Sequence, residues 1–295
     1  MNKTVPRILL MFLLLVSVAE AQEYDYDVPF VPTRNEVLDV MLSMAKVTKD
    51  DVLYDLGCGD GRIVVTAAKR FGCHGVGIDI NPVRIAESKG NAAKAKVTDS
   101  VRFIEQNLFD ADIREATVVT LYLLPDVNLK LRPNLIKQLK PGTRVVSHNY
   151  SMGDWEADAS KEVEVKGSTH DVYFRVVPAN VSGTWRVTIP AAAGTKKYVI
   201  TLNQKFQQVD GTVKMGSMNH PILEFKVNGD GVVFSLEGTG GEKAVPMRFE
   251  GKVNGDSMSG VVATFSGQSK TETSWKAVRN PGTSKLIDAE GDNKR

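Results

Sequence analysis

Hydrophobic positions along this chain of 295 residues follow one pattern up to about residue 178 and another pattern after it. In the first part, short apolar runs alternate with stretches in which apolar residues recur every three or four positions. These alternating strand and helix signals predict a doubly wound α/β domain, with a parallel sheet covered on both faces. The expected strands are Val52–Leu56, Gly75–Ile80, Val101–Glu105, Ala116–Leu121, Arg144–His148 and Asp171–Val177. Three helices are expected between them: one that follows the first strand and ends at Phe71, one at Pro82–Lys96 and one at about Leu129–Leu139.

The segment before this sheet is expected to be an extended strap followed by a helix. Pro29 and Pro32 lie so close together that the backbone around them must be extended. Thr33 and Glu36 have the spacing of a capping box. This spacing predicts that the side chain of Thr33 caps the helix that follows.

From Gly183 onward, β-branched and aromatic residues alternate with polar ones, and glycines interrupt the pattern without any helical period. Phe225–Asp230 is echoed at Lys252–Asp256, and both copies contain Asn-Gly, a strong signal for a tight hairpin turn. Six or seven short antiparallel strands predict a small all-β barrel or sandwich. We therefore expect a Rossmann-like domain at residues 22–179, an antiparallel β domain at 180–280 and a disordered tail at 281–295.

Two tryptophans in the β domain allow two interpretations. Trp185 and Trp275 lie near its first and last strands, where they can pack together to close a barrel. A ligand cavity lined by these side chains is the alternative. Neither an acid pair nor a nucleophile triad accompanies them in this part of the sequence.

Residues 1–21 have the three parts of a secretory signal peptide. Lys3 and Arg7 precede the short apolar run Ile8–Val18, and Ala19-Glu20-Ala21 provides a small-x-small cleavage site. We expect cleavage after Ala21, no stable membrane span after it, and an exported protein that is periplasmic or secreted. An uncleaved N-terminal anchor is the alternative.

Composition and cysteine content narrow the function classes only slightly. With 42% hydrophobic and 24% charged residues and a net charge of +2, the chain has no basic excess that would indicate a nucleic-acid partner. Its two cysteines, Cys58 and Cys73, are expected at opposite ends of the parallel sheet. That separation excludes a disulfide and predicts two free, buried thiols.

The clearest chemistry lies in the glycine loop at residues 55–61 and in Asp79. Alternate glycines let the backbone approach a ligand closely, and an acid at the tip of the second strand can accept both hydroxyls of a ribose. A dinucleotide loop would have its third glycine where this chain has Arg62, which disfavours a nicotinamide oxidoreductase. Asp55 and Asp60 are instead placed to attract the ammonium group of S-adenosylmethionine. A glycine-rich turn that binds no ligand is the alternative.

The run Leu53–Arg62 resembles motif I of the class I, seven-strand methyltransferases. With the strap at Pro29–Thr33, the segment at about residues 28–150 is similar to the group that includes the mitochondrial protein-lysine methyltransferases of the ATP synthase c-subunit and of the adenine nucleotide translocase. The resemblance implies S-adenosylmethionine as cofactor, with the glycine loop on its methionine part, Asp79 on its ribose and two further residues on its adenine. The expected cofactor-binding residues are Asp55, Gly57, Gly59, Asp60, Gly61, Asp79, Asn107 and Leu108.

The acceptor is expected to bind beyond the fourth and fifth strands. Methyl transfer from a sulfonium mainly requires alignment, although a lysine acceptor must also lose a proton. Tyr122 and His148 are the candidate catalytic residues, and His148 can accept a proton. A hydrogen-bonded histidine at a strand end is the alternative role. The other candidates for this side are Leu124, Pro125, Asn149 and Tyr150, and the scattered His74, His170 and His220 indicate no metal site.

Two functions remain open at this point. The leading hypothesis is an exported S-adenosylmethionine-dependent methyltransferase whose acceptor is a protein lysine or a small molecule. The alternative is a non-catalytic protein that binds this cofactor or a nucleoside, while its β domain recruits a partner.

Overall fold

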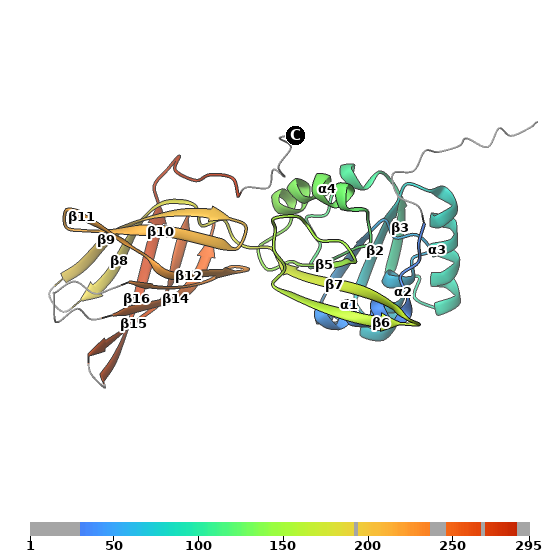
Figure 1. Cartoon of the computed structure of the whole chain (residues 1–295), viewed down its shortest axis with the longest axis horizontal. Coiled ribbons are helices and arrows are strands. Elements are labelled where there is room, and N and C mark those ends of the chain that lie inside the picture. Colours follow the sequence, from blue (N-terminus) through green and yellow to red (C-terminus); the bar gives the residue numbers. More distant parts are fainter. Residues whose placement is uncertain (1–29, 192–193, 237–245, 267–268, 288–295) are drawn as a thin grey trace, which may run out of the picture.

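The computed structural model describes residues 30–191, 194–236, 246–266 and 269–287. An α/β part and a β-barrel lie end to end along the long axis of the molecule (Figure 1). The signal peptide expected at residues 1–21 lies outside the described residues. Among the helices in the described ranges, none is long and apolar enough to cross a membrane.

The α/β part is built on a seven-stranded sheet with the order β3-β2-β1-β4-β5-β7-β6. The first five strands in this order are parallel, whereas β7 runs antiparallel to both of its neighbours. The bounds are β1 Val52–Leu56, β2 His74–Asp79, β3 Val101–Glu105, β4 Val118–Leu121, β5 Arg144–His148, β6 Ala159–Val165 and β7 Ser168–Val176. The expectation of a wholly parallel sheet is therefore wrong at this edge. Strand β6 was not predicted because its residues are mostly polar and exposed, as an edge strand permits.

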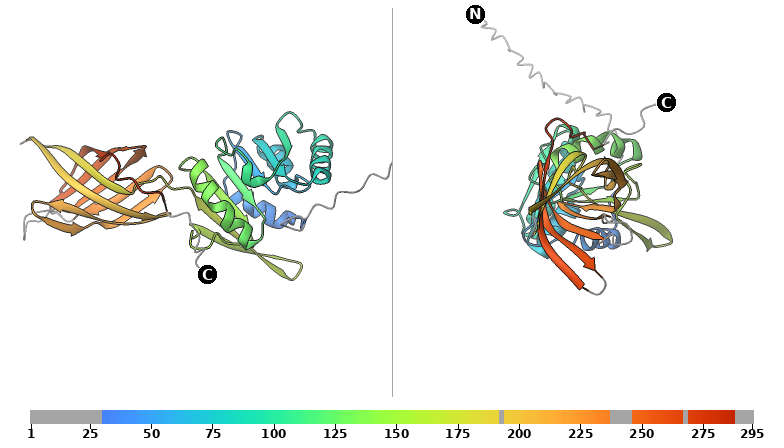
Figure 2. Two further views of the ribbon diagram at one scale, coloured as in Figure 1. Left: turned by 90° about the horizontal axis from the view of Figure 1, so that it is seen from above. Right: turned by 90° about the vertical axis from the view of Figure 1, so that its left-hand side faces the viewer.

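Helices cover both faces of this sheet. Helices α1 (Asn35–Met44), α2 (Arg62–Phe71) and α3 (Pro82–Ala95) share one hydrophobic core with one face. Helix α4 (Pro125–Gln138) packs on the opposite face, as the views in Figures 1 and 2 show. A short 3-10 helix, η1 (Leu108–Asp110), follows β3. The predicted doubly wound layering is confirmed.

The start of α1 differs from the expected capping box. Arg34 is the N-cap residue, and no side chain caps the helix. Thr33 is instead buried, with its hydroxyl oxygen 3.3 Å from Nδ1 of His148. The side chain that was expected to cap the helix therefore joins it to the distant end of β5.

The two cysteines are free and buried, as predicted. Cys58 follows the carboxyl end of β1, whereas Cys73 precedes the start of β2, so the length of the sheet separates them. Burial raises the pKa of the Cys73 thiol to about 11. Both thiols therefore stay protonated at neutral pH and act as small apolar core residues.

The second part is a closed antiparallel barrel with eight strand positions in the described residues. Its strands follow one another as neighbours, and the pairings of β8 with β16 and of β9 with β10 close the cylinder. Strands β11 and β12 both pair with β10 and form one interrupted strand position. The bounds are β8 Gly183–Ala191, β9 Gly194–Lys205, β10 Gln208–Met215, β11 Met218–Pro221, β12 Leu223–Asn228, β13 Gly231–Leu236, β14 Met247–Asn254, β15 Ser257–Ser266 and β16 Ser269–Arg279. The barrel rather than the sandwich is confirmed, although β10 and β11 were not predicted.

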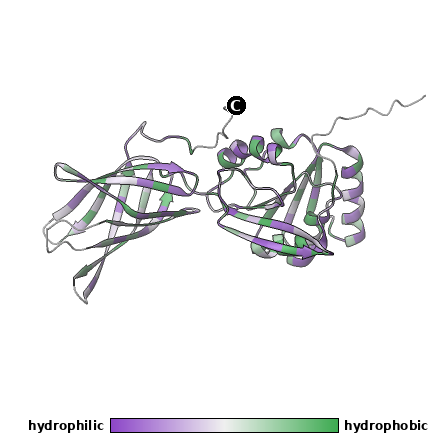
Figure 3. Ribbon diagram, in the orientation of Figure 1, coloured by the Kyte–Doolittle hydropathy of each residue, from purple (hydrophilic) through white to green (hydrophobic). Residues whose placement is uncertain are grey.

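Hydrophobic and hydrophilic residues alternate along the barrel strands (Figure 3), and the inward residues fill the interior. Trp275 is buried with its ring edge-on to Phe234 and Phe249, at centroid distances of 5.7 and 5.5 Å. Its indole nitrogen donates a hydrogen bond of 3.1 Å to the carbonyl oxygen of Glu250. A Cβ atom on Gly251 would lie 2.7 Å from this indole, so only glycine fits beneath it. Trp275 therefore packs in the barrel core against these two phenylalanine rings.

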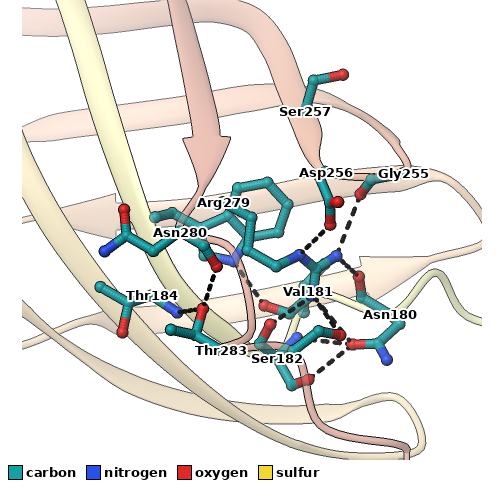
Figure 4. A network of polar contacts seen from close by, with 12 residues as sticks. Asn180, Val181, Ser182, Thr184, Gly255, Asp256, Ser257, Arg279, Asn280 and Thr283 are labelled. Atoms are coloured by element: carbon teal, nitrogen blue, oxygen red, sulfur yellow. Dashed lines mark hydrogen bonds and ion pairs between the residues drawn. The ribbon is translucent and has the colours of Figure 1, made fainter.

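Arg279 lies at one barrel end, beside Asn180 and Ser182 of the connector between the two parts (Figure 4). Its buried guanidinium lies 4.4 Å from the ring centroid of Trp185 and pairs with Asp256 at 2.9 Å. It also donates hydrogen bonds to the backbone oxygens of Asn180 and Ser182, at 2.7 and 2.5 Å. One side chain therefore holds the barrel end and the connector between the two parts together.

The tail expected to be disordered is ordered over residues 281–287. Ile287 is buried in the core beneath α4, so the chain returns to the α/β part after completing the barrel. The backbone nitrogen of Lys285 donates to Oγ of Ser182 at 2.9 Å. Because the tail is mostly polar, its sequence did not indicate that Ile287 would be buried. Residues 288–295 lie outside the described ranges.

Candidate cofactor and acceptor site

A cavity of about 450 Å³ lies at the carboxyl edge of the parallel strands. The loops after β1, β2, β3 and β4 meet there because parallel strands present their carboxyl ends at the same edge. The expected site residues that line it are Asp55, Gly57, Gly59, Asp60, Asp79, Asn107, Leu108 and Tyr122. Gly61 and His148 are not among the lining residues.

The glycine loop owes its shape to positive φ angles. Gly57 and Gly59 have φ values of +82° and +52°. A Cβ atom on Gly59 would lie 2.4 Å from the ring of Phe30, and one on Gly57 would lie 2.8 Å from the side chain of Leu123. Both glycines therefore let the loop pass close to the walls of the cavity.

Gly61 has a different role from the other two glycines. It is the N-cap of α2 in the left-handed conformation, with φ +74°. A Cβ atom there would lie 2.7 Å from both Ser88 and Phe103. The structure thus places Gly61 where α2 packs closely against α3 and β3, away from the cavity.

Asp79 fastens the glycine loop to the end of β2. Its carboxylate accepts hydrogen bonds from the backbone nitrogens of Gly59 at 2.8 Å and of Asn81 at 2.9 Å. A carboxylate offers about four lone-pair positions, so Asp79 retains capacity for ligand hydroxyls. The residue therefore shapes the loop and can also bind a ribose.

Asp55 is a buried carboxylate in the cavity wall. The hydroxyl of Thr120 on β4 donates a hydrogen bond of 2.7 Å to its Oδ1. Burial raises the pKa of Asp55 to about 7; the Thr120 hydroxyl opposes this shift, and the nearby charges of Asp79 and Asp60 add to it. A buried, partly ionised carboxyl group beside two other acids is suited to a cationic ligand.

Asp60 was expected to face the ligand ammonium, but Arg62 occupies its carboxylate. Nη2 and Nε of Arg62 lie 2.6 and 2.9 Å from its two oxygens. Burial acts to raise the pKa of Asp60, but the hydrogen bonds and charge of Arg62 outweigh it and leave the pKa below its usual value. Of the two acids expected to attract the ammonium group, Asp60 is therefore the one already paired with an arginine, which leaves that role to Asp55. Arg62 also donates to the backbone oxygen of Thr33 at 3.1 Å, which joins the glycine loop to the strap.

The strap forms one wall of the cavity, which the proline pattern indicated only as extended backbone. Phe30, Val31, Pro32 and Thr33 all line it. The guanidinium of Arg84 lies 4.2 Å from the centroid of the Phe30 ring, on the α3 side. The strap is thus held over the glycine loop by packing and by a cation–π contact.

Tyr122, one of the residues expected on the acceptor side, lines the cavity directly after β4. Its ring lies 3.8 Å from the His148 ring and 6.3 Å from the Tyr150 ring, centroid to centroid. Nδ2 of Asn149 donates a hydrogen bond of 3.4 Å to its hydroxyl. Asn149 is itself fixed by Asp171, because each backbone nitrogen donates to an oxygen of the other residue, at 2.7 and 3.1 Å.

The geometry around His148 favours the alternative role, a hydrogen-bonded histidine at a strand end. The ring is buried, with Nδ1 3.3 Å from Oγ1 of Thr33 and Nε2 3.0 Å from Nδ1 of His170. Burial and the neighbouring His170 lower the pKa of His148 to about 4, so it is neutral at physiological pH. His170 seemed isolated in the sequence because only the antiparallel pairing of β5 with β7 brings it next to His148.

Other cavity residues carried no motif. Ile80, Asn81, Gln106 and Phe109 line the cavity beside Asn107 and Leu108. Each lies within four residues of the end of β2 or β3, and that position is the sequence signal that could have indicated them. Across the described ranges, no group of three or more His, Cys, Asp or Glu side chains is arranged to hold a metal ion.

Comparison with known proteins adds family information to this geometry. The family model of the ANTKMT methyltransferase domain matches residues 55–159, which end before the barrel. A protein-lysine N-methyltransferase from Saccharolobus islandicus is 49% identical over 151 residues, which cover 51% of this chain and 94% of that protein. The human lysine N-methyltransferase of the ATP synthase c-subunit is 29% identical over 130 residues, covering 44% of this chain and 55% of that enzyme.

Solved structures include a similar chain from Salinibacter ruber, described as an RNA methyltransferase in complex with S-adenosyl-L-homocysteine. It is 53% identical, with a TM-score of 0.47, and the match covers 50% of this chain and 93% of that one. The match to the human enzyme extends over little more than half of that enzyme's length.

Proposed function

The chain belongs to the ANTKMT methyltransferase family and is an S-adenosylmethionine-dependent methyltransferase, and we propose that its acceptor is a protein lysine. The methyl group would be transferred to the side-chain amine of that lysine. Family membership favours an enzyme over the non-catalytic alternative. Two relatives, one a protein-lysine N-methyltransferase and the other a lysine N-methyltransferase of the ATP synthase c-subunit, support a lysine acceptor for this chain. The acceptor side of the cavity provides independent support.

The cavity residues fit S-adenosylmethionine. Asp55 offers a buried carboxylate for an ammonium group, and Asp79 retains lone pairs for ribose hydroxyls. Asn107 and Leu108 border the part of the cavity after β3. When bound, the cofactor supplies an electrophilic methyl group on a positively charged sulfur. The residues of this chain would bind the cofactor and orient it.

The observation that carries the proposal is an acidic strand face on the β6–β7 hairpin, which the backbone of Asp171 connects to Tyr122 through Asn149. On the β6–β7 hairpin, Glu162 is the direct cross-strand partner of Asp171, which is hydrogen-bonded to Asn149. Glu164 lies two residues further along the same face. No basic side chain of the described residues forms an ion pair with these three carboxylates, whereas Asp60, Asp154 and others have such partners. Like charges placed directly opposite repel, so this face is suited to a basic substrate segment.

The residues at the acceptor end can prepare a lysine by desolvation. The nitrogen of a lysine must lose its proton before it attacks, and burial lowers the pKa of an amine because it disfavours the charged form. The rings of Tyr122 and Tyr150 provide such surroundings, and burial also raises the pKa of the Tyr122 hydroxyl, which stays a neutral phenol. The site therefore contributes alignment and desolvation rather than a charged base.

The acceptor is tested by transfer of tritiated methyl from S-adenosylmethionine to a protein extract of the cell envelope. After acid hydrolysis, we expect the label in methylated lysine with the wild-type chain and none with Asp55→Ala. Label in the RNA fraction or in a small molecule, with protein unlabelled, would overturn the lysine acceptor.

We also propose that the mature enzyme acts outside the cytoplasm. The basic start, the short apolar run and the small-x-small site of residues 1–21 support this location. A phosphatase reporter that is active only after export, fused after residue 30, is expected to be active. The same fusion without residues 2–21 is the control and is expected to be silent. Equal activity of the two fusions, or silence of both, contradicts export.

A further inference from the structure

The hairpin between β9 and β10 inserts a barrel side chain into the core of the α/β part. Phe206 lies at its tip and is only 1% exposed. Its ring stacks on Trp155 at a centroid distance of 5.8 Å, and the guanidinium of Arg132 on α4 lies 5.0 Å from its centroid. Phe206 also has a φ of +51°, which is uncommon for a bulky residue. The surroundings of this side chain therefore hold a backbone conformation that is unfavourable by itself.

The residues around Phe206 hold the same segment through polar contacts. Nζ of Lys205 lies 2.8 Å from a carboxylate oxygen of Asp154. Gln207 donates a hydrogen bond of 2.8 Å to the backbone oxygen of Glu156, and Gln208 donates one of 3.0 Å to its carboxylate. The hairpin thus contacts the second half of the loop at residues 149–158, which we call the acceptor loop.

The first half of the acceptor loop lies behind Tyr122, the cavity residue that we assign to the acceptor end. It begins with Asn149 and Tyr150, whose contacts with Tyr122 are described above. A backbone hydrogen bond of 3.3 Å from Trp155 to Met152 folds the two halves together, and both side chains are fully buried. Few residues therefore separate the Phe206 contact from the acceptor end.

The α/β part supports this loop at separate points. Nη1 of Arg132 donates a hydrogen bond of 2.7 Å to the backbone oxygen of Met152. Nε of Arg175 on β7 donates one of 2.7 Å to the backbone oxygen of Trp155. Because Arg132 also faces Phe206, the barrel tip and the α4 side chain form one packed group with the loop.

We propose that the barrel hairpin Lys205–Gln208 positions the acceptor loop for methyl transfer, which makes Phe206 a positioning residue of an acceptor site in another part of the fold. The inference rests on the proposed acceptor end at Tyr122. The cofactor side of the cavity is lined by residues from the strap, the glycine loop and the ends of β2 and β3, and by none from the acceptor loop. Loosening the hairpin is therefore expected to impair transfer and leave cofactor binding intact.

The test compares Phe206→Ala with Phe265→Ala in the full chain. Phe265 is a partly exposed phenylalanine on the outer surface of β15, so its loss is a matched control for the barrel. Three quantities are measured: the affinity for S-adenosylhomocysteine, hydrogen exchange of the amides at residues 149–156, and the initial rate of tritium transfer to the envelope protein extract at saturating cofactor.

For Phe206→Ala we expect an affinity within twofold of wild type, amide exchange at least tenfold faster in the acceptor loop, and a transfer rate at least tenfold lower. Phe206→Leu, which keeps an apolar side chain, should recover much of the rate, and Phe265→Ala should match wild type in all three. Unchanged exchange or an unchanged rate would overturn the inference, and so would a parallel loss of cofactor affinity. If the wild-type chain labels no protein, the proposed acceptor fails, and the exchange and affinity measurements still decide whether the hairpin orders the loop.

Discussion

The hydroxyl of Thr120 donates a hydrogen bond of 2.7 Å to the carboxylate of Asp55, joining β4 to the end of β1 in the wall of the cofactor cavity. The carboxyl group is buried beside two other acids, and its pKa is about 7. At neutral pH, the protonated and ionised forms of Asp55 are thus similarly populated, and a bound cation would favour the ionised form. We therefore expect the affinity for the cofactor to depend on pH through this residue.

Affinity for S-adenosylmethionine is expected to fall as the pH drops below about 7. Below its pKa, Asp55 is protonated in the empty site, and the neutral group attracts the cofactor's ammonium less. The loss should approach roughly tenfold per pH unit, since binding then requires release of one proton. Calorimetry over about pH 5 to 7 measures it, because an α-amino group with a pKa of about 7.7–8.0 largely keeps its proton there. Asp55→Asn should bind weakly and show little pH dependence, and a flat wild-type profile contradicts the role of Asp55.

Asp79→Ala is expected to weaken cofactor binding because it removes a ribose acceptor and the carboxylate that fastens Gly59 and Asn81. Hydrogen bonds to a charged group contribute about 1.5–3 kcal/mol each, so the dissociation constant should rise roughly 10- to 150-fold. Asp112→Ala, which removes an exposed carboxylate outside the cavity lining, is the control. An Asp79→Ala affinity within twofold of wild type would remove Asp79 from the pocket.

Neutralising the acidic strand face is expected to affect the acceptor and not the cofactor. The double variant Glu162→Gln with Glu164→Gln should raise KM for the protein acceptor several-fold and reduce its dependence on salt. It should leave the cofactor dissociation constant unchanged, because neither residue lines the cavity. The control removes two exposed carboxylates from the barrel, through Glu250→Gln with Glu272→Gln. If both double variants show the same acceptor KM, the strand face has no part in substrate binding.

Arg279→Ala is expected to destabilise the barrel because it leaves buried backbone oxygens of the connector without their donor. Such losses cost about 1–3 kcal/mol, and the free energy of unfolding in urea, followed by tryptophan fluorescence, should fall by about that amount. Arg186→Ala, which truncates an exposed arginine of β8, should change it by less than about 0.5 kcal/mol. Equal stability of the two variants would mean that Arg279 does not hold the barrel end.

Much of the α/β part could be predicted from the sequence because its signals are local. The bounds of β1, β3 and β5 are the expected ones, since each is a short segment with neighbouring β-branched or large apolar residues at its centre or start. Strand β6 escaped prediction for the opposite reason, because an edge strand with polar side chains has no apolar period. Strand β10 alternates, with Val209, Val213 and Met215 facing inward, but Gly211 occupies the inward position between them and interrupts its apolar pattern.

The cofactor side of the site is likewise encoded in contiguous segments, from the glycine loop to the residues after β3. The contacts that connect distant segments could not be read in the same way. In the sequence, Arg62 was informative only because it stands where a dinucleotide-binding loop has glycine. In the structure, its side chain binds Asp60 and the strap. Phe206 looked like an ordinary strand residue, and its place in the core of the other part depends on the complete fold.

The central claim is that this chain transfers a methyl group from S-adenosylmethionine to a protein lysine. The most direct measurement is mass spectrometry of an envelope protein extract incubated with deuterated-methyl S-adenosylmethionine and the purified chain. Peptides carrying deuterated methyl groups on lysine, present with the wild-type chain and absent with Asp55→Ala, are the predicted result. Deuterated methyl groups found only in RNA or in small molecules, or on no product at all, would contradict it.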